Sequence, residues 1–212
     1  MADIFLVDDH VMLREGLRNV LEKAGHRVVG EAGHPAAAIA DIARLQPSVV
    51  LLDLHLEPDS GFDVLEEVQR RKLPSRVVML TMSANPRHVV EALRRGALGY
   101  VLKDSASLEL LNAVEVVANG HRYLCRRAST LAVEGLMAES RSAAVLSLSA
   151  RERQVILMVV RGLTSAVIST KLDLSPKTVE SYRARIMAKL GVDDVPALVR
   201  LAVREGLIGV ED

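Results

Sequence analysis

Aromatic residues are scarce in this chain: they make up 2% of its 212 residues, and tryptophan is absent. Proteins that bind RNA or single-stranded DNA usually stack bases on aromatic side chains, so this composition argues against such a surface. With one cysteine, Cys125, no disulfide can form within the chain, which fits a reducing cytoplasm. The chain also lacks the roughly 18 consecutive apolar residues of a membrane helix and the opening pattern of a signal peptide. We therefore expect a cytoplasmic protein.

An excess of charge of one sign is missing as well, because 27 basic and 27 acidic residues cancel. Half of the residues are apolar, which suffices for two modest cores and excludes a disordered chain, a collagen-like fibre or a polybasic tail. The charges are unevenly spread. Residues 1–120 carry 13 basic and 17 acidic side chains, whereas residues 176–190 carry four basic and one acidic. That basic stretch is typical of a nucleic-acid-binding end, but also of a solvated helix face.

Residues 1–119 alternate short apolar runs with longer segments of helical periodicity. Strands are predicted at 4–7, 28–29, 49–52, 77–80 and 100–102, and helices at 11–24, 36–45, 62–71, 86–95 and 107–119. Alternation of this kind indicates βαβ units, and hence a doubly wound, parallel, five-stranded α/β sheet of flavodoxin-like type with helices on both faces. Ligands of such sheets bind at the carboxyl ends of the strands.

The rest of the chain has a different pattern. Residues 120–147 are interpreted as a linker, with a short helix over 131–137. Residues 148–212 carry no strand signal and predict a small all-α domain. A capping box at Ser149 begins the first of its four predicted helices, which runs to residue 161. The other three are expected at 165–171, 176–190 and 196–205. Two of them are joined by a tight turn, which is typical of a helix-turn-helix. The predicted domains are therefore 1–119 and 148–212.

Polar side chains follow four of the predicted strands. They are Asp8, Asp9, Asp53, Thr81 and Lys103. Carboxylates gathered in one crevice repel unless a cation neutralises them, and oxygen ligands favour Mg²⁺ over Zn²⁺. A carboxylate, a Mg²⁺ ion, a lysine and a hydroxyl are what an acyl-phosphate needs. A single aspartate at a strand end is usually a turn or cap residue, but five residues on four strand ends favour a shared site.

These residues, together with the stretch 99–104 around Lys103, resemble a response-regulator receiver domain. The resemblance implies that Asp53 accepts a phosphoryl group and that Asp8, Asp9 and Asp53 hold Mg²⁺ with the backbone carbonyl of His55. It also implies that Thr81 and Tyr100 form a switch pair, in which the aromatic ring follows the hydroxyl inward. Two departures from the usual pattern bear on phosphorylation rates: Pro58 comes five residues after the acceptor, and Met82 follows the switch threonine.

Residues 148–208 are similar to the helix-turn-helix domain of the NarL/FixJ/LuxR group, through the stretches 148–153, 162–164, 174–183 and 186–192. The resemblance implies that the helix from Pro176 lies in the major groove of DNA. Val179, Ile186 and Leu190 are expected to face the core. The expected DNA-contacting residues are Lys177, Thr178, Glu180, Ser181, Tyr182, Arg183, Arg185 and Lys189. Glu180 would either accept from a cytosine amino group or merely repel phosphate.

The two resemblances together predict a two-component transcription regulator. A sensor histidine kinase would phosphorylate Asp53, and a homodimer would bind paired half-sites on double-stranded DNA. The receiver would catalyse its own phosphorylation and dephosphorylation, and no membrane contact is expected. An aspartyl-phosphate hydrolase is disfavoured, since such enzymes usually carry an acid/base aspartate where this chain has His55. The remaining alternative is a phosphorylation-independent DNA-binding regulator whose receiver serves as a dimerisation scaffold.

Overall fold

The computed structural model describes residues 1–105 and 107–208. The chain divides into two compact units, 1–136 and 137–212. Helix α6 (Arg126–Leu146) contributes residues to both. None of the helices within the described residues is long and apolar enough to cross a membrane.

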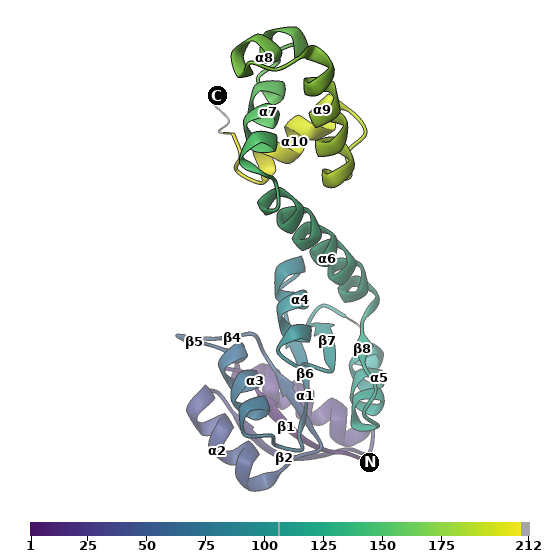
Figure 1. Ribbon diagram of the computed structural model, residues 1–212. Helices are drawn as coiled ribbons and strands as arrows, with labels where there is room; N and C mark the ends of the chain where they lie inside the picture. Colours follow the sequence, from purple (N-terminus) through teal and green to yellow (C-terminus); the bar gives the residue numbers. More distant parts are fainter. Residues whose placement is uncertain (106, 209–212) are drawn as a thin grey trace. The chain divides into compact units, whose positions relative to one another are not determined.

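The first unit is built on a parallel sheet with the strand order β2-β1-β3-β6-β7-β8 (Figure 1). The strands are β1 (Asp3–Val7), β2 (Arg27–Ala32), β3 (Val49–Leu52), β6 (Arg76–Thr81), β7 (Gly99–Leu102) and β8 (Tyr123–Leu124). The first five are the predicted ones, so the doubly wound α/β fold is confirmed. The predicted strand count is one short, because the two residues of β8 are too few to show a periodicity.

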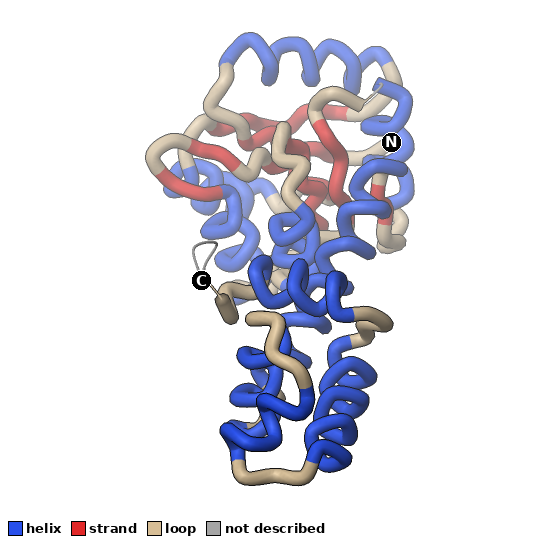
Figure 2. Tube along the Cα trace, turned by 90° about the horizontal axis from the view of Figure 1, so that it is seen from above, coloured by secondary structure: helices blue, strands red, loops and turns tan. Residues whose placement is uncertain are grey.

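Helices cover both faces of the sheet, as the blue and red segments of Figure 2 show. The helices are α1 (Val11–Lys23), α2 (Pro35–Leu45), α3 (Gly61–Arg70), α4 (Pro86–Arg94) and α5 (Ser107–Ala118). Strand side chains alternate between two cores. In β1, Ile4 and Leu6 pack in the core with α1 and α5, while Phe5 and Val7 pack in the core with α2, α3 and α4.

A two-stranded hairpin follows the third strand directly. It consists of β4 (His55–Leu56) and β5 (Asp59–Ser60), neither of which is among the strands predicted from the sequence. The hairpin returns the chain to the end of β3, and Gly61 donates its backbone N–H to the Leu54 carbonyl at 2.8 Å. A Cβ on Gly61 would lie 1.9 Å from the Asp53 carbonyl oxygen, so this close return requires glycine.

The interpretation of 120–147 as a linker with one short helix is wrong in its secondary structure. Residues 123–124 form β8, and α6 runs over 21 residues. The first part of α6 packs through small residues: Ala128 and Ala132 are buried in the core that contains α4. Alanine and glycine at helical spacing give little hydrophobic signal, which is why the sequence does not reveal this helix. A Cβ on Gly135 would lie 2.6 Å from Val90 Cγ2 and 2.7 Å from the Pro86 oxygen.

The second unit confirms the four predicted helices. They are α7 (Ala150–Val160), α8 (Ser165–Leu172), α9 (Pro176–Leu190) and α10 (Val195–Arg204). Ser149 and Glu152 form the predicted capping box, and Ser175 caps α9 by accepting from the Thr178 N–H at 3.1 Å. Val179, Ile186 and Leu190 are buried in the core of this unit, as predicted.

Replacing Gly135 by alanine should destabilise the first unit by about 1–3 kcal/mol, because its Cβ would overlap backbone and side-chain atoms of α4. The measurement is urea unfolding followed by circular dichroism, with hydrogen exchange of α4 and α6 peptides as the local readout.

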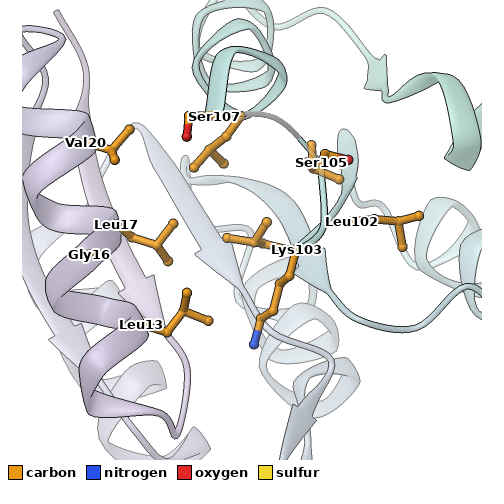
Figure 3. Close-up of a pocket in the computed structure, with 11 residues that line it drawn as sticks. Leu13, Gly16, Leu17, Val20, Leu102, Lys103, Ser105 and Ser107 are labelled. Carbon is orange, nitrogen blue, oxygen red and sulfur yellow. The ribbon is translucent and has the colours of Figure 1, made fainter.

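The matched control is Gly16→Ala in the middle of α1. Gly16 lines a pocket of about 250 Å³ between α1 and α5, and a Cβ there meets nothing within 4 Å (Figure 3). This change should stabilise the chain by about 0.5–1 kcal/mol through helix propensity alone. Equal effects of the two substitutions would contradict the packing of α6 on α4.

Candidate functional site

The sheet brings the three predicted carboxylates together at the ends of the adjacent strands β1 and β3. Asp8 and Asp53 are buried, with 2% and 4% exposure, and Asp9 is half-buried. Ligand atoms of Asp8, Asp9, His10 and Asp53 all lie within 4.8 Å of one another. Like charges at this spacing are costly in a buried crevice unless cations offset them.

Lys103 supplies a cation at the end of β7. Its Nζ lies 2.6 Å from Asp8 Oδ2 and 2.6 Å from Asp53 Oδ2, and its side chain is 9% exposed. Burial lowers the pKa of Lys103, but the hydrogen bonds and the negative charges of Asp53 and Asp8 together raise it by more, so the ammonium stays charged. Figure 3 shows its aliphatic chain passing beside the pocket between α1 and α5.

Backbone and neighbouring side chains orient the acidic pair. The His10 N–H donates to Asp8 Oδ1 at 2.9 Å, and His10 Nδ1 lies 2.6 Å from Asp9 Oδ1. Arg14 Nη1 donates to the Asp8 carbonyl at 2.5 Å. His10 also occupies the N-cap position of α1 without a side-chain cap. Sequence reasoning gave Arg14 no role, and one arginine in a helix carries no signal for such a contact.

The oxygen atoms of this cluster fit a hard divalent cation. Asp53 Oδ1 is buried and, within the described part of the chain, has no hydrogen-bond partner. A buried carboxylate oxygen left without a donor is costly, and Mg²⁺ prefers such oxygen ligands. His55 lies two residues beyond Asp53 in β4, with an exposed side chain. The metal-binding role of its carbonyl stays a prediction.

Thr81 and Tyr100 meet through Ser83, a residue that the sequence did not single out. Thr81 is fully buried, and its Oγ1 accepts from the Ser83 N–H at 3.2 Å. The Tyr100 hydroxyl donates to the Ser83 carbonyl at 2.9 Å, with the ring fully buried. Burial raises the pKa of Tyr100 to about 12. The tyrosine is therefore held in its inward position.

Helix α9 of the second unit presents one exposed face. Its exposed residues other than Pro176 and Lys189 follow helical spacing: Lys177, Glu180, Ser181, Ala184, Arg185 and Ala188. The Arg185 guanidinium lies 5.8 Å from the centre of the Tyr182 ring, which is half-buried. Most of the predicted DNA-contacting residues are on or beside this face.

Two of the predicted DNA-contacting cations have partners within the unit. Lys189 Nζ donates to the Ser147 carbonyl at 2.7 Å and lies 3.3 Å from Glu152 Oε2. Arg183 is half-buried and donates to Ser165 Oγ at 3.0 Å. These contacts join α9 to its neighbours in the unit, and a DNA contact of either residue stays a prediction.

Comparison with known proteins assigns each unit. Residues 4–115 match the response regulator receiver domain, and residues 146–202 match the bacterial regulatory proteins of the luxR family. The chain belongs to the NarL/FixJ/LuxR response regulators. As a member, it is a DNA-binding transcriptional response regulator of a two-component system.

Relatives of this response regulator cover both units. The response regulator UvrY of Escherichia coli K12 is 34% identical over 100% of this chain and 98% of its own. The DNA-binding transcriptional activator DevR/DosR of Mycobacterium tuberculosis is 35% identical over 91% and 90%.

The fold is likewise that of solved response regulators. An RcsB structure from Salmonella typhimurium has a TM-score of 0.61 and 28% identity, over 94% of this chain and 96% of the other. Another RcsB structure, a complex with DNA, has a TM-score of 0.60 and 27% identity over the same shares. A third contains two RcsB dimers bound to two parallel DNAs, with a TM-score of 0.59, 27% identity and again the same shares.

Replacing Lys103 by methionine should lower the free energy of unfolding by about 3–5 kcal/mol in metal-free buffer, because it leaves two buried carboxylates unpaired. The pKa of this lysine is raised above its ordinary 10.5. Its contribution is therefore complete below about pH 10 and is lost as the pH rises through the folded value. The deficit should stay constant between pH 7 and 9.

Urea unfolding with and without Mg²⁺ measures this effect. Mg²⁺ should restore part of the deficit, because it neutralises the same carboxylates. Lys23→Met, at an exposed position in the last turn of α1, is the control and should change stability little. A Lys103→Met variant as stable as the parent would contradict the ion-pair geometry.

Proposed function

We propose that Asp53 is the phosphoryl acceptor of this response regulator and that a sensor histidine kinase is its donor. The observation that carries the proposal is the position of Lys103, whose ammonium joins Asp53 to Asp8. Among the residues that the structure describes, none donates a hydrogen bond to the buried Asp53 Oδ1. The acceptor oxygen is thereby directed into a site with a fixed positive charge.

Asp8, Asp9 and Asp53 would hold Mg²⁺, with the His55 backbone carbonyl as a further ligand. When bound, the ion would offset negative charge on the transferred phosphoryl group. A carboxylate oxygen of Asp53 forms the new bond to phosphorus as the bond from phosphorus to the donor's imidazole nitrogen breaks. Lys103 neutralises a phosphoryl oxygen, and the Thr81 hydroxyl donates a hydrogen bond to another. The same groups would serve the later hydrolysis by water.

The Thr81–Ser83–Tyr100 contacts support a role of these residues as the switch. When the Thr81 hydroxyl turns toward a phosphoryl oxygen, it no longer accepts from the Ser83 N–H. The Ser83 carbonyl accepts from the Tyr100 hydroxyl, so a shift of Ser83 on release from Thr81 would also move Tyr100. We propose that this coupling changes the α4 surface and controls the second unit, with α9 in the major groove of DNA.

The acting form would be a homodimer on paired half-sites in the bacterial cytoplasm. This is supported by the likeness to RcsB, which is described as dimers on DNA. The DNA-contacting set is the exposed face of α9, namely Lys177, Glu180, Ser181 and Arg185, with Thr178 and Tyr182 beside it. A phosphorylation-independent regulator is not needed to explain these observations.

The acceptor is tested by intact mass after incubation with Mg²⁺ and phosphoramidate. The parent should gain one phosphoryl adduct that is absent with EDTA and absent from Asp53→Asn. Asp59→Asn, a matched change at an exposed position of the adjacent hairpin, should leave the adduct in place. An adduct on Asp53→Asn, or none on the parent with phosphoramidate or with a kinase, would overturn the assignment.

The DNA-contacting set is tested by the salt dependence of binding to a 30-base-pair duplex of random sequence. Lys177→Met should lower the slope of log affinity against log salt by about one, since one phosphate contact is lost. Lys189→Met should keep the slope but destabilise the second unit, because it breaks contacts to Ser147 and Glu152. The reverse pattern would contradict the assignment of these two lysines.

A further inference from the structure

Glu180, on the exposed face of α9, is held by a side chain from the neighbouring helix α8. The Ser165 hydroxyl donates to Glu180 Oε1, and Ser165 Oγ in turn accepts from Arg183 Nη1 at 3.0 Å. A guanidinium can only donate, so the serine oxygen must be the acceptor of that bond. Its single proton is then directed to the glutamate. The hydrogen bonds therefore run in one direction, from Arg183 to Ser165 and from Ser165 to Glu180.

Two of the three hydrogen-bonded residues, Arg183 and Ser165, are partly buried in the second unit. Arg183 is half-buried and lies beside Ile156, Val159 and Ile186. Ser165 is half-buried in the first turn of α8, next to its N-cap Thr164. A carboxylate fixed in this way loses less side-chain entropy on binding than a free surface glutamate does. One hydrogen bond also leaves most of the acceptor capacity of the carboxylate available.

We propose that Glu180 selects a cytosine in the major groove and that Ser165 is its positioning residue. The inference rests on the proposed placement of α9 in that groove. An ionised carboxylate only accepts hydrogen bonds, so it is repelled by the acceptor edges of guanine and thymine. Adenine offers an amino donor beside its N7 acceptor. Cytosine offers its N4 amino group with no acceptor on its own major-groove edge, and it is therefore the base that Glu180 fits.

Glu180 should also weaken binding to DNA sequences that lack the cytosine, because of the charges around it. Lys177 and Arg185 on the same face attract the phosphate backbone of any duplex. A carboxylate between them weakens every complex in which it finds no donor, and so widens the gap between right and wrong sites. Removal of Glu180 should consequently raise affinity for random DNA while it lowers discrimination.

The test is selection from a randomised 30-base-pair duplex library by the full chain, treated with Mg²⁺ and phosphoramidate, followed by sequencing of the bound fraction. The variants are Glu180→Ala, Ser165→Ala and Ser165→Thr, which keeps the hydroxyl. Asp193→Ala is the control, because it removes one exposed negative charge just beyond α9.

We expect the parent to require cytosine at one position of each half-site. Glu180→Ala should reduce the preference there by about tenfold or more and leave other positions of the motif unchanged. Ser165→Ala should weaken the preference at the same position, and Ser165→Thr should restore it. Asp193→Ala should keep the motif of the parent. A role in stability alone would not alter one base position selectively.

An unchanged motif in Glu180→Ala, with affinity raised equally for all duplexes, would show that Glu180 only repels phosphate and would overturn the proposal. A preference lost in Glu180→Ala but intact in Ser165→Ala would overturn the positioning role of the serine. If the parent enriched no motif, the placement of α9 in the groove would fail, and the inference with it.

Discussion

Repulsion between carboxylates at the ends of β1 and β3 is the constraint on which the first unit depends. Asp8 and Asp53 are nearly removed from water, and Lys103 is the cation that makes their proximity tolerable. Within residues 1–105 and 107–208, one oxygen of Asp53 still has no hydrogen-bond donor. One lysine thus offsets only part of the negative charge of the two buried carboxylates, and a further cation would stabilise the site.

In the second unit, two basic side chains of α9 form contacts with neighbouring helices. Lys189 joins α9 to the capping box of α7, and Arg183 reaches α8 through Ser165. The sequence predicts that both cations contact DNA, but in the structure they stabilise the packing of α9. The surface left for a ligand is therefore less basic than the composition of 176–190 suggests, and it includes a fixed carboxylate.

Much of this could be predicted from the sequence, because strong periodicity and strand-end chemistry are local signals. The five strands, the four C-terminal helices and the acidic cluster belong to that class. The misses have a common cause: β8 is two residues long, α6 packs through Ala128, Ala132 and Gly135, and Ser83 acts through its backbone. None of these leaves a hydrophobic period or a distinctive residue type. Likewise, only the folded unit shows that Ser165 and Glu180, 15 residues apart, touch.

The sixth strand extends the compact first unit beyond residue 119, where the sequence predicts a linker. The Cys125 N–H donates to the Tyr100 carbonyl at 3.1 Å, and α6 begins at the next residue. A chain cut after residue 119 would lose this edge strand and, with it, the hydrogen bond from Cys125 to the Tyr100 carbonyl. A chimera with a relative that is joined at residue 119 would therefore separate β7 from the strand that pairs with it, whereas a junction within α6 would keep the two strands together.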